Sequence, residues 1–287
     1  MAPIIRTVGL RKVYAVGKER VVALDNVDIS VEKGEFCCIV GQSGSGKSTL
    51  LNQLAGLEKP TRGKVFIGKH EISAMTENEL AAFRQAHLGF IFQSYNLLPS
   101  MTAAENVALP LMFKGMGRRQ RLALAKQELK SMGLSSRVNH LPTEMSGGQQ
   151  QRVGIARAFV SRPKVIFADE PTGNLDSKTS RQVLLRMLEM SKKEQITFVM
   201  VTHEPSLAAC ADRIITILDG RVQSDVVPPE EERIRRREAL AAELAQAEAE
   251  EAAAEAREKA EKGEQPPQAQ QPEKEPADKI NRTYHFR

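Results

Sequence analysis

Residues 35–49 read EFCCIVGQSGSGKST, an apolar run followed by a loop rich in glycine and serine. The run at 35–40 predicts a buried strand, and the apolar spacing after Lys47 predicts a helix. The loop between them fits the pattern G-x-x-x-x-G-K-[ST], from Gly41 to Ser48. A strand, such a loop and a helix in succession predict a site for a phosphate group.

The residue types in this loop suit a nucleoside triphosphate. Glycines allow the backbone to wrap with its N–H groups facing inward, toward phosphate oxygens. Lys47 adds a positive charge for the β- and γ-phosphates, and Ser48 offers a hydroxyl to Mg²⁺. The alternative is a glycine-serine turn with a surface lysine, but the predicted strand and helix on either side favour the phosphate site. The residues that we expect to bind ATP here are Gly41, Ser43, Gly44, Ser45, Gly46, Lys47, Ser48 and Thr49.

A second apolar run, VIFADE at 165–170, predicts a strand that ends in two carboxylates. Successive side chains on a strand point to opposite faces, so Asp169 and Glu170 can have different roles. We expect Asp169 to reach the water shell of the metal and Glu170 to polarise an attacking water. The alternative is a solvated strand end, with Pro171 turning the chain. Because charges are costly to bury, the functional interpretation is favoured.

A third apolar run, ITFVMVTH at 196–203, ends in Thr202 and His203. A single histidine is usually structural. This one follows a predicted buried strand in a chain that also has a phosphate-binding loop. We therefore expect His203 to contact the γ-phosphate of a bound nucleotide.

Residues 145–158, MSGGQQQRVGIARA, predict a second helix that begins at an anion-binding end. Ser146 precedes two glycines, and the apolar residues that follow recur at helical spacing. The N-terminus of a helix attracts negative charge. One chain therefore carries two predicted phosphate-binding segments, and the sequence raises the question of why it needs both.

Strand and helix patterns alternate over residues 1–227, which predicts an α/β domain with a mainly parallel sheet. Asp219-Gly220, between two apolar runs, predicts a hairpin turn. None of the apolar runs approaches the roughly 20 residues that are needed to cross a bilayer. We therefore expect the protein in the cytosol or on the cytosolic face of a membrane.

Charge and cysteine content limit the class of ligand and the compartment. Residues 1–228 hold 30 Lys and Arg against 21 Asp and Glu, whereas residues 229–287 hold 11 against 15. A basic globular part suits anionic ligands or an anionic membrane surface, and an ordinary soluble surface fits nearly as well. The chain has three cysteines, which fit small core residues in a reduced compartment. Cys37 and Cys38 are adjacent in a predicted strand, so we expect them on opposite faces.

The last part of the chain differs in composition from the rest. Residues 229–263 are rich in alanine, glutamate and arginine, which predicts a mostly solvated helix that is docked, if at all, at its first turns. Residues 264–287 are rich in proline and glutamine, which predicts a disordered tail. The terminal INRTYHFR regains apolar and aromatic residues, so a docking peptide is the alternative.

Five motifs occur in the order found in ATP-binding cassette (ABC) ATPases: the phosphate-binding loop, Gln93 in GFIFQSYNLLP, MSGGQ at 145–149, VIFADE at 165–170 and His203. The chain resembles this family over about 1–227. MSGGQ differs from the commoner LSGGQ by Met145, a volume-conserving change. The resemblance implies a P-loop core with a mainly parallel sheet and an antiparallel β subdomain. It also implies a helical subdomain at about 94–160 that carries MSGGQ.

In this family two cassettes pair head to tail with ATP between them. The resemblance therefore implies that the second segment binds the γ-phosphate of an ATP that is held mainly by the partner copy. The residues implied in this contact are Ser146, Gly147, Gly148 and Gln149. Each of the two segments in one chain would then be half of a site, and two ATP molecules would close the dimer.

The resemblance assigns the remaining roles by position. Tyr14 is implied to stack on adenine, with a core tyrosine as the alternative. Gln93 is implied to contact the metal or the attacking water and to couple the site to a partner, and Asp176 to lie in a loop that crosses between subunits. Glu170 is implied to be the general base, and His203 to fix the γ-phosphate. The implied ligands of Mg²⁺ are Ser48, Gln93 and Asp169.

Residues 93–116, QSYNLLPSMTAAENVALPLMFKGM, are similar to the branch that includes LolD, MacB and FtsE. This similarity implies an ATPase that powers separate transmembrane subunits of few spans, with a periplasmic protein as a further possible partner. The work would be export, lipoprotein or lipid extraction, or force transmission. The ATPase of a solute importer is the alternative. A soluble ABC ATPase acting on nucleic acid or ribosomes is less consistent, because Ser48 and Ser146 are too close in sequence for a long coiled-coil insertion.

Overall fold

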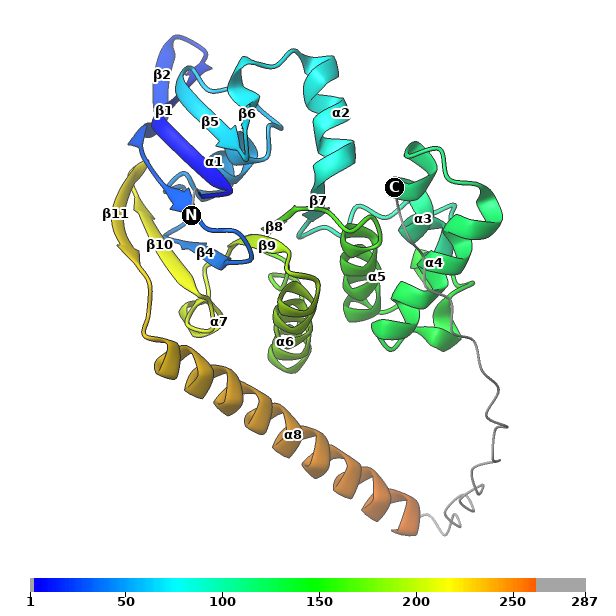
Figure 1. Ribbon diagram of the computed structural model, residues 1–287. Coiled ribbons are helices and arrows are strands. Elements are labelled where there is room, and N and C mark those ends of the chain that lie inside the picture. Colours follow the sequence, from blue (N-terminus) through cyan, green and yellow to red (C-terminus); the bar gives the residue numbers. More distant parts are fainter. Residues whose placement is uncertain (1–2, 262–287) are drawn as a thin grey trace. The chain divides into compact units, whose positions relative to one another are not determined.

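The computed structural model describes residues 3–261, with side chains up to 246 (Figure 1). Contacts divide the chain into two units, 1–244 and 245–287. The strands are β1 (Ile5–Val16), β2 (Glu19–Val27), β3 (Ser30–Val31), β4 (Phe36–Val40), β5 (Arg62–Ile67), β6 (His70–Glu71), β7 (Leu88–Ile91), β8 (Val165–Asp169), β9 (Thr197–Val201), β10 (Arg213–Leu218) and β11 (Arg221–Val226). The helices are α1 (Lys47–Leu54), α2 (Glu77–His87), α3 (Ala103–Phe113), α4 (Arg118–Ser131), α5 (Gly147–Phe159), α6 (Ser177–Glu194), α7 (Pro205–Ala208) and α8 (Glu230–Glu261).

The larger sheet has the strand order β11-β10-β4-β9-β8-β7. The strands from β10 to β7 are parallel, and β11 pairs antiparallel with β10 at one edge. The central strands β4, β8 and β9 are short, continuous apolar runs, as expected for strands buried on both faces. Asp219 and Gly220 join β10 to β11 with φ angles of 47° and 73°. Two positive φ angles fit a tight hairpin turn, so the predicted parallel sheet and hairpin are both confirmed.

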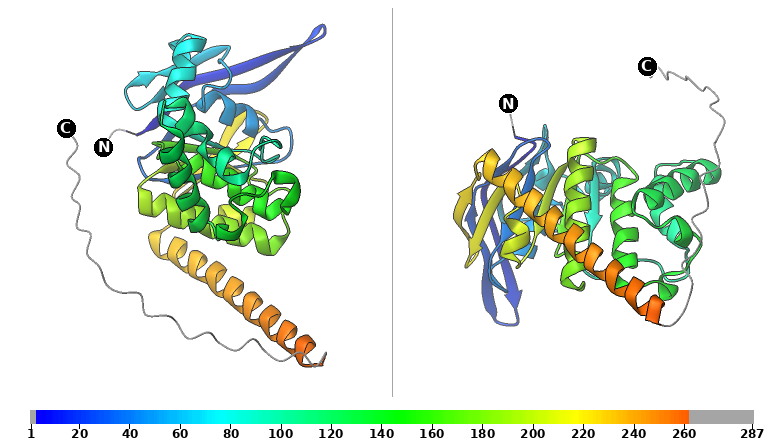
Figure 2. Two further views of the ribbon diagram at one scale, coloured as in Figure 1. Left: turned by 90° about the vertical axis from the view of Figure 1, so that its right-hand side faces the viewer. Right: turned by 90° about the horizontal axis from the view of Figure 1, so that it is seen from below.

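The smaller sheet is antiparallel, with the order β2-β1-β5-β6 and β3 paired to β1. The hairpin formed by β1 and β2 projects from this sheet (Figure 2). At its tip Val16 is 61% exposed. The antiparallel subdomain that the resemblance implied is therefore present.

The larger sheet is covered by a different layer on each face. Cys37 and Phe167 pack with α1 and the antiparallel sheet. Cys38 and Ala168 pack with α5, α6 and the other helices on the opposite face. Adjacent strand residues thus enter different cores, and the two cysteines lie on opposite faces, as predicted. All three cysteines are free and buried.

Helices α3, α4 and α5 pack against one another on this helical side (Figure 1). Thr102 caps α3, and Glu105 completes the capping box, which satisfies the first backbone N–H groups. Asn106 is fully buried and bonds Leu98 through both its amide nitrogen and its oxygen. This side chain fixes the loop that joins β7 to α3. The three-part architecture implied by the sequence is confirmed.

The first turns of α8 are attached to the first unit. Arg233 and Arg237 both donate to Asp212 Oδ1, at 2.5 and 2.9 Å. The other carboxylate oxygen of Asp212 accepts from the N–H of Phe36 at 2.9 Å. Leu240 is 9% exposed and belongs to the helical-side core.

Of the helices between residues 3 and 261, none is both long and apolar enough to span a membrane. The tail expected at 264–287 lies outside the described residues.

We expect Arg237→Ala to lower the free energy of unfolding by about 1–2 kcal/mol, measured by urea denaturation. Arg237 also donates to the carbonyl of Cys210 at 2.8 Å, and hydrogen bonds from charged groups contribute about this much when partly exposed. Arg235, on the same helix, is exposed. Arg235→Ala is the matched control and should change stability by less than about 0.5 kcal/mol. If the two substitutions lowered the free energy of unfolding equally, the claim that Arg237 attaches α8 to Asp212 would be contradicted.

Candidate functional site

Four parallel strands of the larger sheet end at the same edge. In the pairing register Ile39 of β4 lies beside Val201 of β9, and Val201 lies beside Asp169 of β8. Ile91 of β7 pairs with Ala168 of β8. The ends of these strands and the segments that follow them carry the predicted site residues, which are the loop at 41–46, His203, Asp169 with Glu170, and Gln93. Parallel pairing therefore brings together residues that are far apart in sequence.

The phosphate-binding loop joins β4 to α1, as predicted. Gly46 immediately precedes α1 with φ of 104°, and a Cβ there would lie 2.5 Å from the carbonyl oxygen of Ala23. A Cβ on Gly41 would collide with the carbonyl oxygen of Ile217. Because neighbouring backbone leaves no space at these two positions, the tight path of the loop requires glycine.

Two polar side chains are buried at the start of α1. Lys47 is 6% exposed, and its Nζ donates to the carbonyl of Gln42 at 2.7 Å. The hydroxyl of Ser45 is buried without a hydrogen-bond partner in the described part of the chain. A buried cation, an unpaired hydroxyl and a helix N-terminus suit an anion. Lys47 and the residues at the start of α1 line a cavity of about 380 Å³, whose lining residues are Ala23, Ser43, Gly44, Gly46, Lys47, Ser48, Thr49, Glu170 and His203.

Ser48, which lines this cavity, is bonded to Asp169 at the end of β8. Ser48 Oγ donates to Asp169 Oδ1 at 3.1 Å. Burial raises the pKa of Asp169, the Ser48 hydroxyl opposes this effect, and the neighbouring Glu170 raises the pKa further. A hydroxyl and a desolvated carboxylate are oxygen ligands of the kind that Mg²⁺ prefers, so this pair fits the predicted metal.

Glu170, His203 and Gln93 converge beside the cavity. His203 Nδ1 lies 3.4 Å from Glu170 Oε2. The Gln93 amide nitrogen and Glu170 Oε2 lie 2.9 and 3.4 Å from the point where a Cβ on Gly173 would be. Glu170 has φ of 42°, in the left-handed region that non-glycine residues rarely occupy. A carboxylate, an imidazole and an amide can together hold a water and a phosphoryl oxygen.

Tyr14 and Asp176 lie outside the lining of this cavity. The Tyr14 hydroxyl donates to Glu58 Oε2 at 2.6 Å, and burial raises the pKa of Tyr14. Lys12 pairs with the same carboxylate at 2.8 Å. Asp176 is exposed and caps α6 by accepting from the N–H of Thr179 at 2.9 Å, which lowers the pKa of its carboxyl. The roles of Tyr14 and Asp176 stay predictions.

The second anion-binding segment forms the start of α5, as predicted. Ser146 accepts from the N–H of Gln149, and the Gln149 side chain accepts from the N–H of Ser146. The glycines between them allow close packing, because a Cβ on Gly147 would lie 2.9 Å from the hydroxyl of Tyr95. None of residues 146–149 is among the described residues that line the cavity. The two phosphate-binding segments of one chain therefore do not share a cavity.

A family profile described as ABC transporter matches residues 24–173. The macrolide export ATP-binding/permease protein MacB of Rhodopirellula baltica is 44% identical over 77% of this chain and 33% of its own length. An uncharacterised ABC transporter ATP-binding protein of Methanocaldococcus jannaschii is 48% identical over 74% of this chain and 94% of its own. The chain belongs to the ABC transporter family.

A solved dimeric ATP-binding cassette, in a post-hydrolysis state with ADP and Pi, superimposes on this ABC cassette with a TM-score of 0.73 and 41% identity. It covers 78% of this chain and 98% of its own. The predictions of an ABC ATPase fold, of ATP hydrolysis and of the MacB-like branch are thus confirmed. The chain spans about a third of the length of MacB.

Several contacts that position the site of this ABC cassette had no signal in the sequence. Arg157 of α5 donates to the carbonyls of Tyr95 and Asn96, at 2.8 and 2.6 Å, and burial lowers its pKa. Asn174 donates to the carbonyl of Gln93 at 3.0 Å. These bonds end on backbone carbonyls, which every residue has, so no residue pattern identifies the acceptors.

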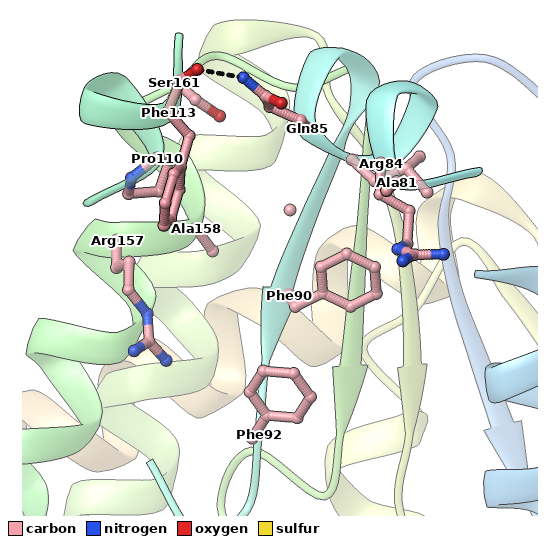
Figure 3. Close-up of a pocket in the computed structure, with 12 residues that line it drawn as sticks. Ala81, Arg84, Gln85, Phe90, Phe92, Pro110, Phe113, Arg157, Ala158 and Ser161 are labelled. Carbon is pink, nitrogen blue, oxygen red and sulfur yellow. Dashed lines mark hydrogen bonds between the residues drawn. The ribbon is translucent and has the colours of Figure 1, made fainter. Parts of the chain in front are cut away.

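An apolar groove lies next to the Gln93 segment (Figure 3). Its volume is about 390 Å³, and it lies among α2, β7, α3 and α5. The rings of Phe90 and Phe92 lie at this space, with Pro110 and Phe113 opposite α2. Arg157 also lines the groove, and its guanidinium is bonded to the carbonyls of Tyr95 and Asn96. Phe113 is 65% exposed, so the groove opens to the surface.

We expect Asp169→Asn to raise the melting temperature of the nucleotide-free ABC cassette at neutral pH, measured by calorimetry. Burial raises the pKa of Asp169, so the folded state binds this proton more tightly than the unfolded state. Stability is then lost as pH rises from the ordinary aspartate pKa to the raised one, and asparagine avoids this loss. The gain should shrink as pH falls. A lower melting temperature of Asp169→Asn at neutral pH would contradict the claim that the buried Asp169 carboxylate destabilises the nucleotide-free fold.

Proposed function

We propose that this ABC cassette pairs head to tail with a second copy of itself and binds two ATP molecules at shared sites. The observation that supports this proposal is the separation of two anion-binding helix ends on one chain. Lys47 and Ser45 lie at the start of α1, whereas Ser146 lies at the start of α5, outside the same cavity. A γ-phosphate contacted by both ends then requires one end from each copy.

Within such a site, the residues of this chain have distinct roles. Lys47 and the loop at 41–46 bind the phosphates, and Tyr14 stacks on the adenine. Ser48, Asp169 and Gln93 would hold Mg²⁺, which would supply positive charge beside the phosphates. Glu170 polarises the attacking water as general base, and His203, 3.4 Å from Glu170, contacts the γ-phosphate. Ser146, Gly147, Gly148 and Gln149 complete the site of the partner copy, and Asp176 lies where the copies cross.

The dimer is proposed to drive separate transmembrane subunits of few spans from the cytoplasmic face of the membrane. The apolar groove supports this proposal, because an open groove lined by aromatic residues suits a partner helix. It lies next to Gln93 through Phe92 and Arg157, so a bound partner would touch the segment that carries Gln93. The relative MacB is named an export ATP-binding/permease protein, which favours export.

Export, lipoprotein or lipid extraction, and force transmission to a periplasmic protein all use this arrangement. A solute importer remains the second candidate, since the ATP chemistry would be the same. The similarity to MacB favours the first group. Co-purification from detergent of a transmembrane protein with few spans and a large periplasmic domain would support it, and a many-span permease would support the importer.

We expect Glu170→Gln to abolish nearly all ATP turnover, leave ATP affinity intact and accumulate an ATP-bound dimer on size-exclusion chromatography. The amide keeps the shape of the side chain but cannot accept the proton of the attacking water. Turnover at the parent rate would show that Glu170 is not the base.

Lys47→Ala is the contrasting variant, because it removes a charge-assisted contact from the phosphates. Its free energy of nucleotide binding should become less favourable by about 1.5–3 kcal/mol. No ATP-bound dimer should therefore form. If both variants formed the dimer equally, the assignment of Lys47 would be wrong.

A further inference from the structure

Gln151 is a buried polar side chain with no role in the site described above. It lies on α5 and is 0% exposed. Its amide nitrogen donates to the carbonyl oxygen of Pro171. A carbonyl oxygen can only accept, so the nitrogen must be the end that faces Pro171. The amide oxygen is buried and has no hydrogen-bond partner in the part of the chain that the structure describes.

Pro171 directly follows Glu170, whose backbone is strained. Glu170 has φ of 42°. The turn around it is tight, because the Glu170 N–H donates to the carbonyl of Val201 and its own carbonyl accepts from Gly173, both at 3.0 Å. A left-handed conformation at a non-glycine residue persists only when its surroundings impose it. The bond from Gln151 to Pro171 is one of the contacts that impose it.

The same turn is held from two other elements. The carbonyl of Thr172 accepts from Ser180 of α6 at 3.4 Å. Asn174 donates to the carbonyl of Gln93. Gln151 supplies the contact from α5, which is closest in sequence to the carboxylate of Glu170. Without the bond from Gln151, Pro171, the residue of the turn next to Glu170, would lose its link to α5.

We propose that Gln151 is a positioning residue that holds the carboxylate of Glu170 in place through Pro171. The proposal rests on the proposed role of Glu170 as general base. Gln151 does not contact the nucleotide site and acts through the backbone of the turn. Because Ser146 caps the start of α5, this bond links the helix end proposed to serve the partner's ATP to the base proposed to serve the chain's own ATP.

The test is Gln151→Met, which keeps the length and volume of the side chain but removes the donor. We expect kcat for ATP hydrolysis to fall about 10- to 100-fold, because a small misplacement of a catalytic group has an effect of this size. ATP affinity should change less than twofold, and an ATP-bound dimer should accumulate as it does for Glu170→Gln. A merely structural residue would lower the melting temperature without trapping this dimer.

Gln150→Met is the matched control. Gln150 lies on the same helix, and its amide nitrogen also donates to a backbone carbonyl, that of Met145, at 3.1 Å. This variant should keep kcat within twofold of the parent. If Gln151→Met keeps the parent kcat, or if Gln150→Met lowers kcat equally, the proposal is overturned.

Two further measurements separate the possible failures. In a Glu170→Gln background, Gln151→Met should lower the residual turnover no further, since residues that act as a unit are not additive. If Glu170→Gln alone is fully active, the role of Glu170 fails first.

If Gln151→Met does not fold, Gln151→Asn, which keeps the amide on a shorter side chain, replaces it. Failure of both to fold would show that Gln151 is a folding residue and overturn the proposal.

Discussion

The structure depends on how the N-termini of two helices are directed. Each end carries unpaired N–H groups that stabilise an anion, and each is shaped by glycines with little space around them. In α1 this end lines a cavity with the buried Lys47, whereas the residues at the start of α5 are not among the described residues that line that cavity. This separation supports the proposed dimer, in which a second copy completes the site around the triphosphate.

The parallel sheet places the chemistry at the α1 end. Strands β4, β9, β8 and β7 all end at one edge. The strand ends and the segments after them carry the loop, the histidine, the two acids and Gln93. The burial that raises the pKa of Asp169 and the left-handed backbone of Glu170 both disfavour the nucleotide-free fold. Such costs are common at functional sites, where charge and strain prepare a site for its ligand.

Sequence patterns predicted much of this arrangement, because each pattern reflects a local physical requirement. The loop from Gly41 to Ser48 could be predicted because a phosphate-binding loop needs glycines and a lysine at fixed positions. VIFADE could be predicted to be a strand because it is an apolar run that ends in two acids. The hydrogen bonds donated by Arg157, Asn174 and Gln151 could not be predicted from the sequence. They join segments distant in sequence and end on backbone carbonyls, which leave no residue signature. Docking of α8 at its first turns was expected from the sequence, but its partner Asp212 was not, because the two segments are far enough apart in sequence that no local pattern pairs them.

The shared site can be tested most directly with mixed dimers, assembled from two copies with different affinity tags. If sites are shared, placing Lys47→Ala and Ser146→Arg on the same copy damages both sites, whereas placing them on different copies leaves one site whole. We predict about one occluded ATP per dimer when the changes lie on different copies and none when they share a copy. The reverse pattern would contradict the account, because it would mean that each copy holds its ATP alone.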